Sequence, residues 1–226
     1  ATARLAKAKR PVIVVGAGAI QVDAHDEIKR LAEALSIPIA TSLGGRAIIP
    51  TTHPLHIGTV GTYSAPPGNQ LVFKADLVIY IGCHAGDQPT NNYTVPAPGT
   101  PIIQIDLNGQ EIGRNYPNTI AVLGCPRQAI DDLLKANKHA VGWSDWAKYA
   151  GSVVADWRAD LASLRKSDNP PTTVERLCHE ISQALPKNGI LVADTGYSGI
   201  WTATLLDLPF KGQSYLRAAG SLGWAF

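Results

Sequence analysis

Two glycines that follow an apolar run near the start of the chain are the first residues whose types and spacing could do chemistry. Gly16, Ala17 and Gly18 come directly after Pro11–Val15, where a strand is expected to give way to a helix. Backbone N–H groups and the positive end of a helix dipole can accept a phosphate at such a turn. A dinucleotide fingerprint needs a third glycine at position 21, where the chain has Gln21. Because the motif is incomplete, a tight turn without a ligand remains an open alternative.

Two polar residues follow other predicted strands. Asp106 ends the apolar segment 101–105, and acidic groups at the ends of parallel strands commonly hold a ribose or an adenine. His84 lies just after the strand predicted over 77–81. It could act as a catalytic base, although a lone histidine after a strand is more often a structural hydrogen-bonding group.

The elements that must position these groups alternate between strand and helix. Four consecutive β-branched residues at 12–15 indicate a strand buried on both faces, which predicts a parallel sheet with helices on each side. Further strands are predicted over 38–41, 77–81, 101–106 and 120–124, helices over 26–35 and 127–135, and a long irregular segment over 46–68. The alternation predicts an α/β fold with a doubly wound, Rossmann-like parallel sheet.

The pattern changes after Leu134. A polar stretch precedes a helix predicted over 144–165, whose aromatic stripe favours a packing face, and Pro170-Pro171 then breaks the chain. A new helix opens at Thr172 or Thr173, and a strand follows over 189–194. We therefore expect a Rossmann-like nucleotide-binding domain over 1–137, a helical connector over 138–171, and an incomplete second α/β unit over 172–226.

Composition narrows the classes of partner. The chain has 226 residues, 45% of them apolar, and a net charge of +2 without basic runs, which disfavours nucleic acid. No apolar run of about 18 residues predicts a membrane span, and no signal peptide is recognisable, so a cytoplasmic location is expected. Cys83, Cys125 and Cys178 stand singly, which excludes a Cys-x-x-Cys pair and makes a disulfide framework improbable. The absence of methionine and the apolar final residues suggest a piece of a longer protein.

Several segments, taken in order, resemble the central domain of thiamine diphosphate enzymes of the acetolactate (acetohydroxyacid) synthase type. These are Arg10-Pro-Val-Ile-Val-Val-Gly-Ala-Gly18, His53-Pro-Leu-His-Ile-Gly-Thr-Val-Gly61, Ala75-Asp-Leu-Val-Ile-Tyr-Ile-Gly82 and Ile105-Asp-Leu-Asn108. Ala193-Asp-Thr-Gly-Tyr-Ser-Gly-Ile-Trp201 and Ala219-Gly-Ser-Leu-Gly223 are similar to the opening of that family's diphosphate-binding domain.

The resemblance implies thiamine diphosphate contacts in the last segments. Gly196, Tyr197 and Ser198 match the loop that approaches the cofactor diphosphate, where backbone N–H and hydroxyl groups can reach phosphate oxygens. A turn followed by a helix start is the alternative. Gly220 matches the residue whose carbonyl accepts from the aminopyrimidine. Leu222 matches the bulky residue that wedges the cofactor into a bent shape.

In the central domain the resemblance implies FAD. The matching positions are Gly16, Ala17, Gly18, Ser42, Leu43, Gly82, Asp106 and Ile112. His84 lies in the segment 82–88, where the synthases carry two arginines that this chain lacks, and histidine or glutamine cannot replace a guanidinium. An adenine nucleotide or an empty site is therefore as open as FAD.

The implied activity is that of a carboligase or decarboxylase acting on 2-oxo acids, a transferase or lyase. In the family a glutamate from an amino-terminal domain activates the cofactor across a dimer interface, and a Gly-Asp-Gly segment holds Mg²⁺. Neither is found in this chain. We therefore expect no catalytic residue and no activity in the isolated piece, and a homodimer or homotetramer for the full-length protein.

Two other classes of function stay open. A sirtuin-like NAD-dependent deacylase also places Gly-Ala-Gly after a buried strand, but its four-cysteine zinc module cannot be built from three scattered cysteines. The second is a non-catalytic domain that binds an adenine nucleotide or a flavin.

Overall fold

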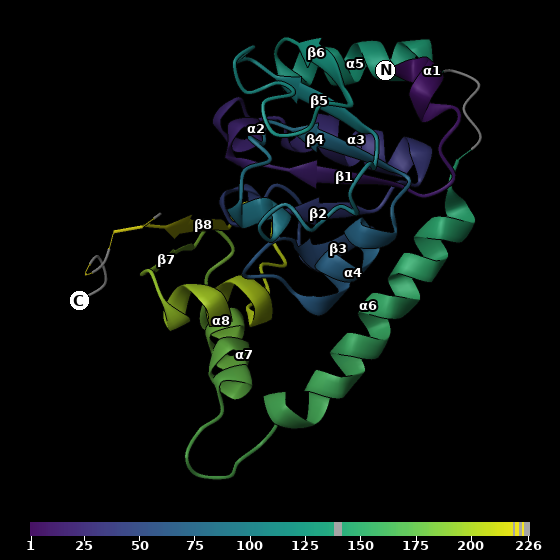
Figure 1. Cartoon of the computed structure of the whole chain (residues 1–226). Coiled ribbons are helices and arrows are strands. Elements are labelled where there is room, and N and C mark those ends of the chain that lie inside the picture. Colours follow the sequence, from purple (N-terminus) through teal and green to yellow (C-terminus); the bar gives the residue numbers. More distant parts are fainter. Residues whose placement is uncertain (138–141, 219, 222, 224–226) are drawn as a thin grey trace.

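A six-stranded parallel sheet forms the larger part of the molecule (Figure 1). The computed structural model describes residues 1–137, 142–218, 220, 221 and 223. The sheet has the order β3-β2-β1-β4-β5-β6, and every neighbouring pair is parallel. Its strands are β1 Pro11–Val15, β2 Ile39–Thr41, β3 His56–Thr59, β4 Leu77–Ile81, β5 Ile102–Asp106 and β6 Thr119–Leu123. The strand order reverses between β1 and β4, so the doubly wound parallel fold is confirmed.

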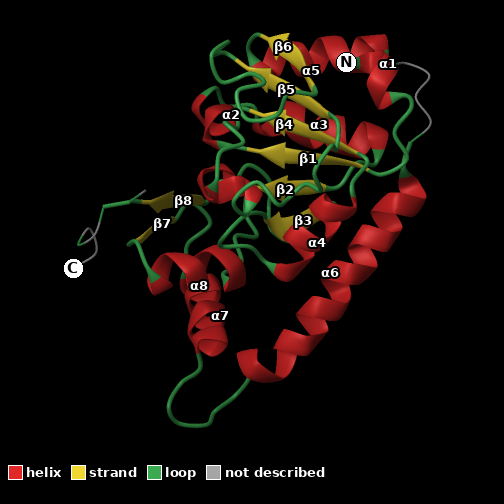
Figure 2. Cartoon of the chain, viewed as in Figure 1, coloured by secondary structure: helices red, strands yellow, loops and turns green. Residues whose placement is uncertain are grey.

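Helices cover both faces of this sheet (Figure 2). The helices are α1 Thr2–Leu5, α2 Ala17–Gln21, α3 His25–Leu35, α4 Pro66–Lys74, α5 Pro126–Ala136, α6 Ser144–Arg165, α7 Val174–Ala184 and α8 Tyr197–Leu205, with short 3₁₀ turns η1 Leu43–Gly45 and η2 Gln88–Thr90. Ile13 and Val15 of β1 pack with α3 and α5, whereas Val12 and Val14 pack with α4 and α6. Burial of alternate side chains on opposite faces explains why β1 is apolar at every position.

Helix α6 connects the sheet to the rest of the chain (Figure 1). Trp146 near its start is 8% exposed, and its Nε1 donates to the carbonyl of Pro11 at 3.0 Å. Tyr149 is 41% exposed, so the predicted packing stripe is interrupted there. Trp157 and Leu161 pack against a different cluster, which α7 and α8 form. The helix therefore packs on the sheet at its start and on the following unit further along.

The C-terminal unit contains a second, smaller sheet. Strands β7 Ile190–Ala193 and β8 Ser214–Arg217 pair in parallel, and neither joins the larger sheet in the described part of the chain. Ile190, Val192 and Leu216 are 61%, 52% and 55% exposed, although β7 is apolar throughout. The helices α7 and α8 thus cover one face of the small sheet and leave the other face open.

The prediction of an irregular segment over 46–68 was wrong. It contains β3, and α4 begins at its end. Gly58 has φ +98° and interrupts the alternation that marks a half-buried strand, while Pro66 and Pro67 look like turn residues but are favourable in a first helical turn. A Cβ at Gly68 would lie 2.1 Å from the carbonyl oxygen of Thr59, so glycine permits the close approach of α4 to β3.

Candidate functional site

The segments that follow β7 and β8 are tied to each other, and we call them the β7–β8 loop pair: residues 194–198 on one side, and 218, 220, 221 and 223 on the other. Thr195 Oγ1 donates to the carbonyls of Ala218 at 2.5 Å and Ser221 at 2.8 Å. Asp194 Oδ2 accepts from the N–H of Gly223 at 2.9 Å. Two segments that were predicted separately from the sequence are therefore brought together at the carboxyl ends of two parallel strands.

Gly196 sets the direction in which the first segment enters α8. Its φ of 96° and ψ of −149° lie in a region that is essentially restricted to glycine. In the described part of the chain no heavy atom lies within 4 Å of the position where a Cβ would stand. The first N–H groups of α8, which have no partner inside the helix, therefore begin at an uncrowded turn.

The side chains of Tyr197 and Ser198, in the first segment of the loop pair, are exposed. Tyr197 is 75% exposed and stacks on Trp201 with ring centroids 6.4 Å apart. Ser198 is exposed, and its Oγ donates to the carbonyl of Asp194 at 3.2 Å. Gly220 lies in the partner segment at φ +87°, whereas Leu222 is outside the described residues. The structure thus brings Gly196, Tyr197, Ser198 and Gly220 to one place.

Sequence reasoning missed Arg217, the last residue of β8. A Cβ at Gly199 would lie 3.0 Å from Arg217 Nε, so the side chain passes beside the first turn of α8. Its guanidinium lies over the ring of Tyr63 at 5.2 Å, and its buried Nε has no hydrogen-bond partner among the described residues. The sequence signal that could have pointed to Arg217 was a cationic residue at the carboxyl end of a strand. It adds positive charge beside the loop pair.

The first turn of the larger sheet is closed by the protein itself. Gly16 N donates to the carbonyl of Ile81 and Gly18 N to that of Gly82, both at 3.0 Å. A Cβ at Gly16 would lie 2.2 Å from the Gly82 oxygen. The N–H of Gly18, which the sequence offers to a phosphate, is therefore already paired, and Ala17 opens a helix of only five residues.

The other residues predicted around the larger sheet lie in two places. Ser42 Oγ accepts from the N–H of Gly45 at 3.2 Å, and Leu43 packs into the cluster formed with the C-terminal unit. Ser42 therefore caps the turn η1, and Leu43 belongs to the contact with the C-terminal unit.

Asp106, Ile112 and His84 lie at the ends of β5 and β4. Asp106 is 7% exposed, and its Oδ1 accepts from the N–H of Asn108 at 2.9 Å. Ile112 is half-buried in the turn that follows, while His84 is exposed. The Gly82 N–H donates to the carbonyl of Ile105 at 2.9 Å, so these loops share one edge of the sheet.

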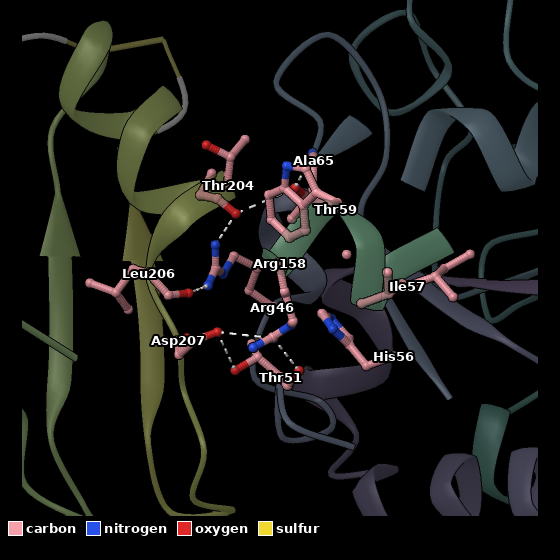
Figure 3. A pocket seen from close by; sticks show the side chains of 14 residues that line it. Arg46, Thr51, His56, Ile57, Thr59, Ala65, Arg158, Thr204, Leu206 and Asp207 are labelled. Carbon is pink, nitrogen blue, oxygen red and sulfur yellow. Dashed lines mark hydrogen bonds and ion pairs between the residues drawn. The ribbon is translucent and has the colours of Figure 1, made fainter. Parts of the chain in front are cut away.

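Arg46 joins this sheet to the C-terminal unit (Figure 3). Its Nη1 donates to the carbonyls of Thr202, at 2.8 Å, and Ala203, and its Nη2 donates to that of Leu206 at 2.6 Å. These carbonyls belong to the last turn of α8, where the helix dipole favours a cation. Burial lowers the pKa of Arg46 from its ordinary value.

Asp207 brings helix α6 to the same place. Its Oδ1 lies 3.1 Å from Arg158 Nη2, and its Oδ2 lies 2.8 Å from Arg165 Nη1. Thr51, in the loop after β2, exchanges hydrogen bonds with Leu208: Thr51 N donates to its carbonyl at 3.0 Å, and Leu208 N donates to Thr51 Oγ1 at 2.8 Å. We call Arg46, Thr51, Arg158, Arg165 and Asp207 the junction. It fixes α8, and with it the loop pair, relative to the larger sheet.

A cluster of metal ligands and a membrane-spanning helix are both absent from the described residues. No group of three or more histidine, cysteine, aspartate or glutamate side chains is arranged to hold a metal ion there. No helix in that part of the chain is both long enough and apolar enough to cross a membrane.

Comparison with known proteins gives a consistent result. Residues 1–133 match the family model described as thiamine pyrophosphate enzyme, central domain. The chain is 31% identical over 230 residues to a probable acetolactate synthase large subunit of Methanocaldococcus jannaschii, covering 98% of this chain and 38% of that protein. It is 31% identical over 225 residues to the acetolactate synthase isozyme 3 large subunit of Escherichia coli, covering 97% and 38%. The chain thus spans about two fifths of the length of these relatives.

Proposed function

The chain belongs to the thiamine pyrophosphate enzymes, whose central domain its residues 1–133 match, and we propose that the complete protein is an acetolactate synthase-like carboligase or decarboxylase of 2-oxo acids. The relatives of similar sequence named above are acetolactate synthases. They give no support to a sirtuin-like deacylase or to a non-catalytic nucleotide-binding domain. A homodimeric or homotetrameric assembly and a cytoplasmic location are part of the same proposal.

The β7–β8 loop pair is the observation that carries this proposal. It fits a diphosphate, because an uncrowded glycine turn at Gly196 leads into the first N–H groups of α8, which have no acceptor inside the helix, with Arg217 beside them. We infer that Gly196, Tyr197 and Ser198 bind the diphosphate of thiamine diphosphate. Gly220, in the adjoining segment, would orient the aminopyrimidine through its carbonyl. The proposed division of the chain places the start of the diphosphate-binding domain at residue 172.

The chemistry divides between the cofactor and the chain. Thiamine diphosphate, when bound, supplies an electron sink for bond cleavage or formation next to the carbonyl of a 2-oxo acid. The residues of this chain bind and orient it, and the junction holds α8 in place while they do so. Mg²⁺ belongs to the proposal for the complete protein, and no step is assigned to it.

A flavin fits the larger sheet poorly. The Gly18 N–H is paired with Gly82, and the segment 82–88 contains no arginine. We therefore assign flavin no role in the reaction. Binding of an adenine nucleotide at the carboxyl end of β5 is a separate proposal that rests on Asp106 alone. The visible absorbance of the purified complete protein tests this directly, because bound FAD would colour it.

The activity is tested with the protein expressed from its complete coding sequence. Pyruvate consumption and acetolactate formation are measured with and without thiamine diphosphate and Mg²⁺, and a panel of other 2-oxo acids is tried in parallel. We expect turnover that requires the cofactor, and none from the 226-residue chain alone. Turnover of no 2-oxo acid, together with adenine nucleotide binding, would instead favour a nucleotide-binding domain.

A further inference from the structure

A groove with a cation, Arg158, in its wall lies on the outer side of the junction, between α6 and the segment that precedes and opens β3. It has a volume of about 370 Å³ and is lined by Thr51, Thr52, His53, His56, Ala155 and Arg158, among others. An inner cavity of about 20 Å³, large enough for roughly one water molecule, continues from it toward Arg46 and Asp207 (Figure 3). The residues of the groove are remote in sequence from the β7–β8 loop pair. A ligand in the groove would therefore be independent of the function proposed for the loop pair.

The junction contains more positive than negative charge. Three guanidinium groups, those of Arg46, Arg158 and Arg165, surround the single carboxylate of Asp207. Arg46 donates from both Nη atoms to helix carbonyls, and Arg165 donates to both Asp207 and the carbonyl of Leu205, although the buried Nε of each has no partner among the described residues. Of the three guanidinium groups, that of Arg158 belongs to the wall of the groove.

Some N–H groups of Arg158 make no hydrogen bond to any described residue. Within the described residues only its Nη2 donates, to the carbonyl of Thr51 at 3.0 Å and to Asp207 at 3.1 Å. Its side chain is 33% exposed and lines the groove. Because a guanidinium carries five N–H donors, Arg158 can bind a second acceptor without releasing the first.

His56 lies beside Arg158 in the same wall (Figure 3). Its imidazole makes no hydrogen bond to any described residue, although it is half-buried. Burial is the main cause that lowers the pKa of His56 to about 3; Arg46, Arg158 and His53 act in the same direction, and Asp207 opposes them. The ring is therefore neutral at pH 7 and offers one donor and one acceptor.

Both ring nitrogens of His53 already make hydrogen bonds. Its Nδ1 accepts from the N–H of Leu55 at 3.2 Å, so its Nε2 carries the proton and donates to Glu33 at 3.0 Å. Glu33 is not among the residues that line the groove. The groove-lining groups that have no partner among the described residues are N–H groups of Arg158 and the imidazole of His56, and the exposed Thr52 also lines the groove.

We propose that this groove binds a small oxyanion, the phosphate or carboxylate group of a small molecule, between the free N–H groups of Arg158 and the imidazole of His56. A charged donor and a neutral donor then converge on the anion, a combination that makes strong hydrogen bonds. Because the groove adjoins the junction, the bound anion also offsets the excess positive charge between α6 and the C-terminal unit.

Calorimetric titration of the 226-residue chain tests the proposal. Inorganic phosphate, acetate and pyruvate are titrated separately at pH 7 in sodium chloride of constant ionic strength. We expect saturable one-site binding of at least one of them. If only phosphate binds, the site prefers a phosphate group, and if only acetate or pyruvate binds, it prefers a carboxylate. Saturation by none of the three overturns the proposal.

A matched pair of variants locates the binding. Ala155 is exposed on α6 and lines the groove, so Ala155→Glu adds a carboxylate there and Ala155→Gln adds the same volume without charge. We expect Ala155→Glu to weaken binding by about tenfold, as a like charge a few ångströms from the anion should. Ala155→Gln is expected to stay within about twofold of the native chain. Equal affinities in the two variants would contradict the site.

Nitrogen NMR tests whether the bound anion contacts the imidazole of His56. A bound anion favours the charged imidazole, so the pKa of His56, measured by nitrogen NMR, is expected to rise when the anion saturates the chain. The pKa of His179, which lies on α7 outside the groove, serves as the internal reference. A saturating anion that leaves the His56 pKa unchanged would contradict contact with this ring.

Discussion

Arg46 Nη2 donates to the carbonyl of Leu206 at 2.6 Å, although 160 positions separate the two residues in the sequence. The same guanidinium lies over the ring of Tyr215 at 5.0 Å. One buried side chain from the larger sheet therefore caps α8 and contacts β8. The loop pair, whose two segments open α8 and follow β8, is thereby fixed relative to the larger sheet.

Replacement of Arg46 should lower the stability of the folded chain. Arg46→Met keeps the apolar stem but takes the guanidinium away from the carbonyls of Thr202 and Leu206 and leaves that of Ala203 with Thr59 Oγ1 alone, so we expect the free energy of unfolding to fall by about 2–4 kcal/mol. Arg46→Lys keeps the charge with fewer well-directed donors, and about half that loss is expected. Urea denaturation followed by tryptophan fluorescence measures both. A methionine variant as stable as the native chain would show that the cap contributes little.

Asp207 should make stability depend on acid pH. Burial opposes its ionisation, but Arg158 and Arg165 outweigh burial and hold the pKa below its ordinary value of 3.8. The contribution is therefore complete above about pH 4 and is lost as the pH falls through the lower, folded-state pKa.

Asp207→Asn tests that dependence. At pH 7 we expect the variant to lose about 2 kcal/mol of unfolding free energy, and the difference from the native chain should shrink in acid. Asp168→Asn removes a 91% exposed carboxylate that pairs with Arg176 and is the matched control, with a small change expected at every pH. A constant difference between Asp207→Asn and the native chain down to pH 2 would contradict the assignment.

Gly16 should tolerate no side chain. A Cβ there would lie 2.2 Å from a backbone oxygen that cannot move aside easily, so we expect Gly16→Ala to destabilise the chain by about 2–3 kcal/mol. At Gly86, in the loop after β4, a Cβ would meet no described atom within 4 Å, and Gly86→Ala should be nearly neutral. Thermal denaturation compares the two, and equal melting temperatures would show that the turn at Gly16 is looser than its contacts indicate.

The strands of the larger sheet could be predicted where burial on both faces leaves a continuous apolar run. Val12–Val15 and Leu77–Ile81 are examples, and both are buried throughout. The short β3 could not be predicted in the same way, because Gly58 breaks its pattern. Helix α4 was hidden by a proline start that is favourable only once the helix is known to be there.

The candidate site was predictable only in part. Gly196, Tyr197, Ser198 and Gly220 were predicted from a resemblance, and their roles stay predictions. The junction was not predicted, because its arginines look like ordinary loop and helix-surface residues in the sequence. Arg46 becomes a cap only when folding brings α8 to it.

Thiamine diphosphate affinity of the complete protein, measured by calorimetry for two alanine variants, tests the central claim most directly. At Gly196 an alanine meets no described atom within 4 Å, so it acts through a backbone conformation that alanine disfavours by about 1–3 kcal/mol. Gly109→Ala is the control, because its Cβ would make an ordinary 3.6 Å contact with Leu123. We expect Gly196→Ala to weaken binding by about tenfold or more and Gly109→Ala to leave it unchanged. Equal cofactor affinity in the two variants would contradict a diphosphate site at the β7–β8 loop pair.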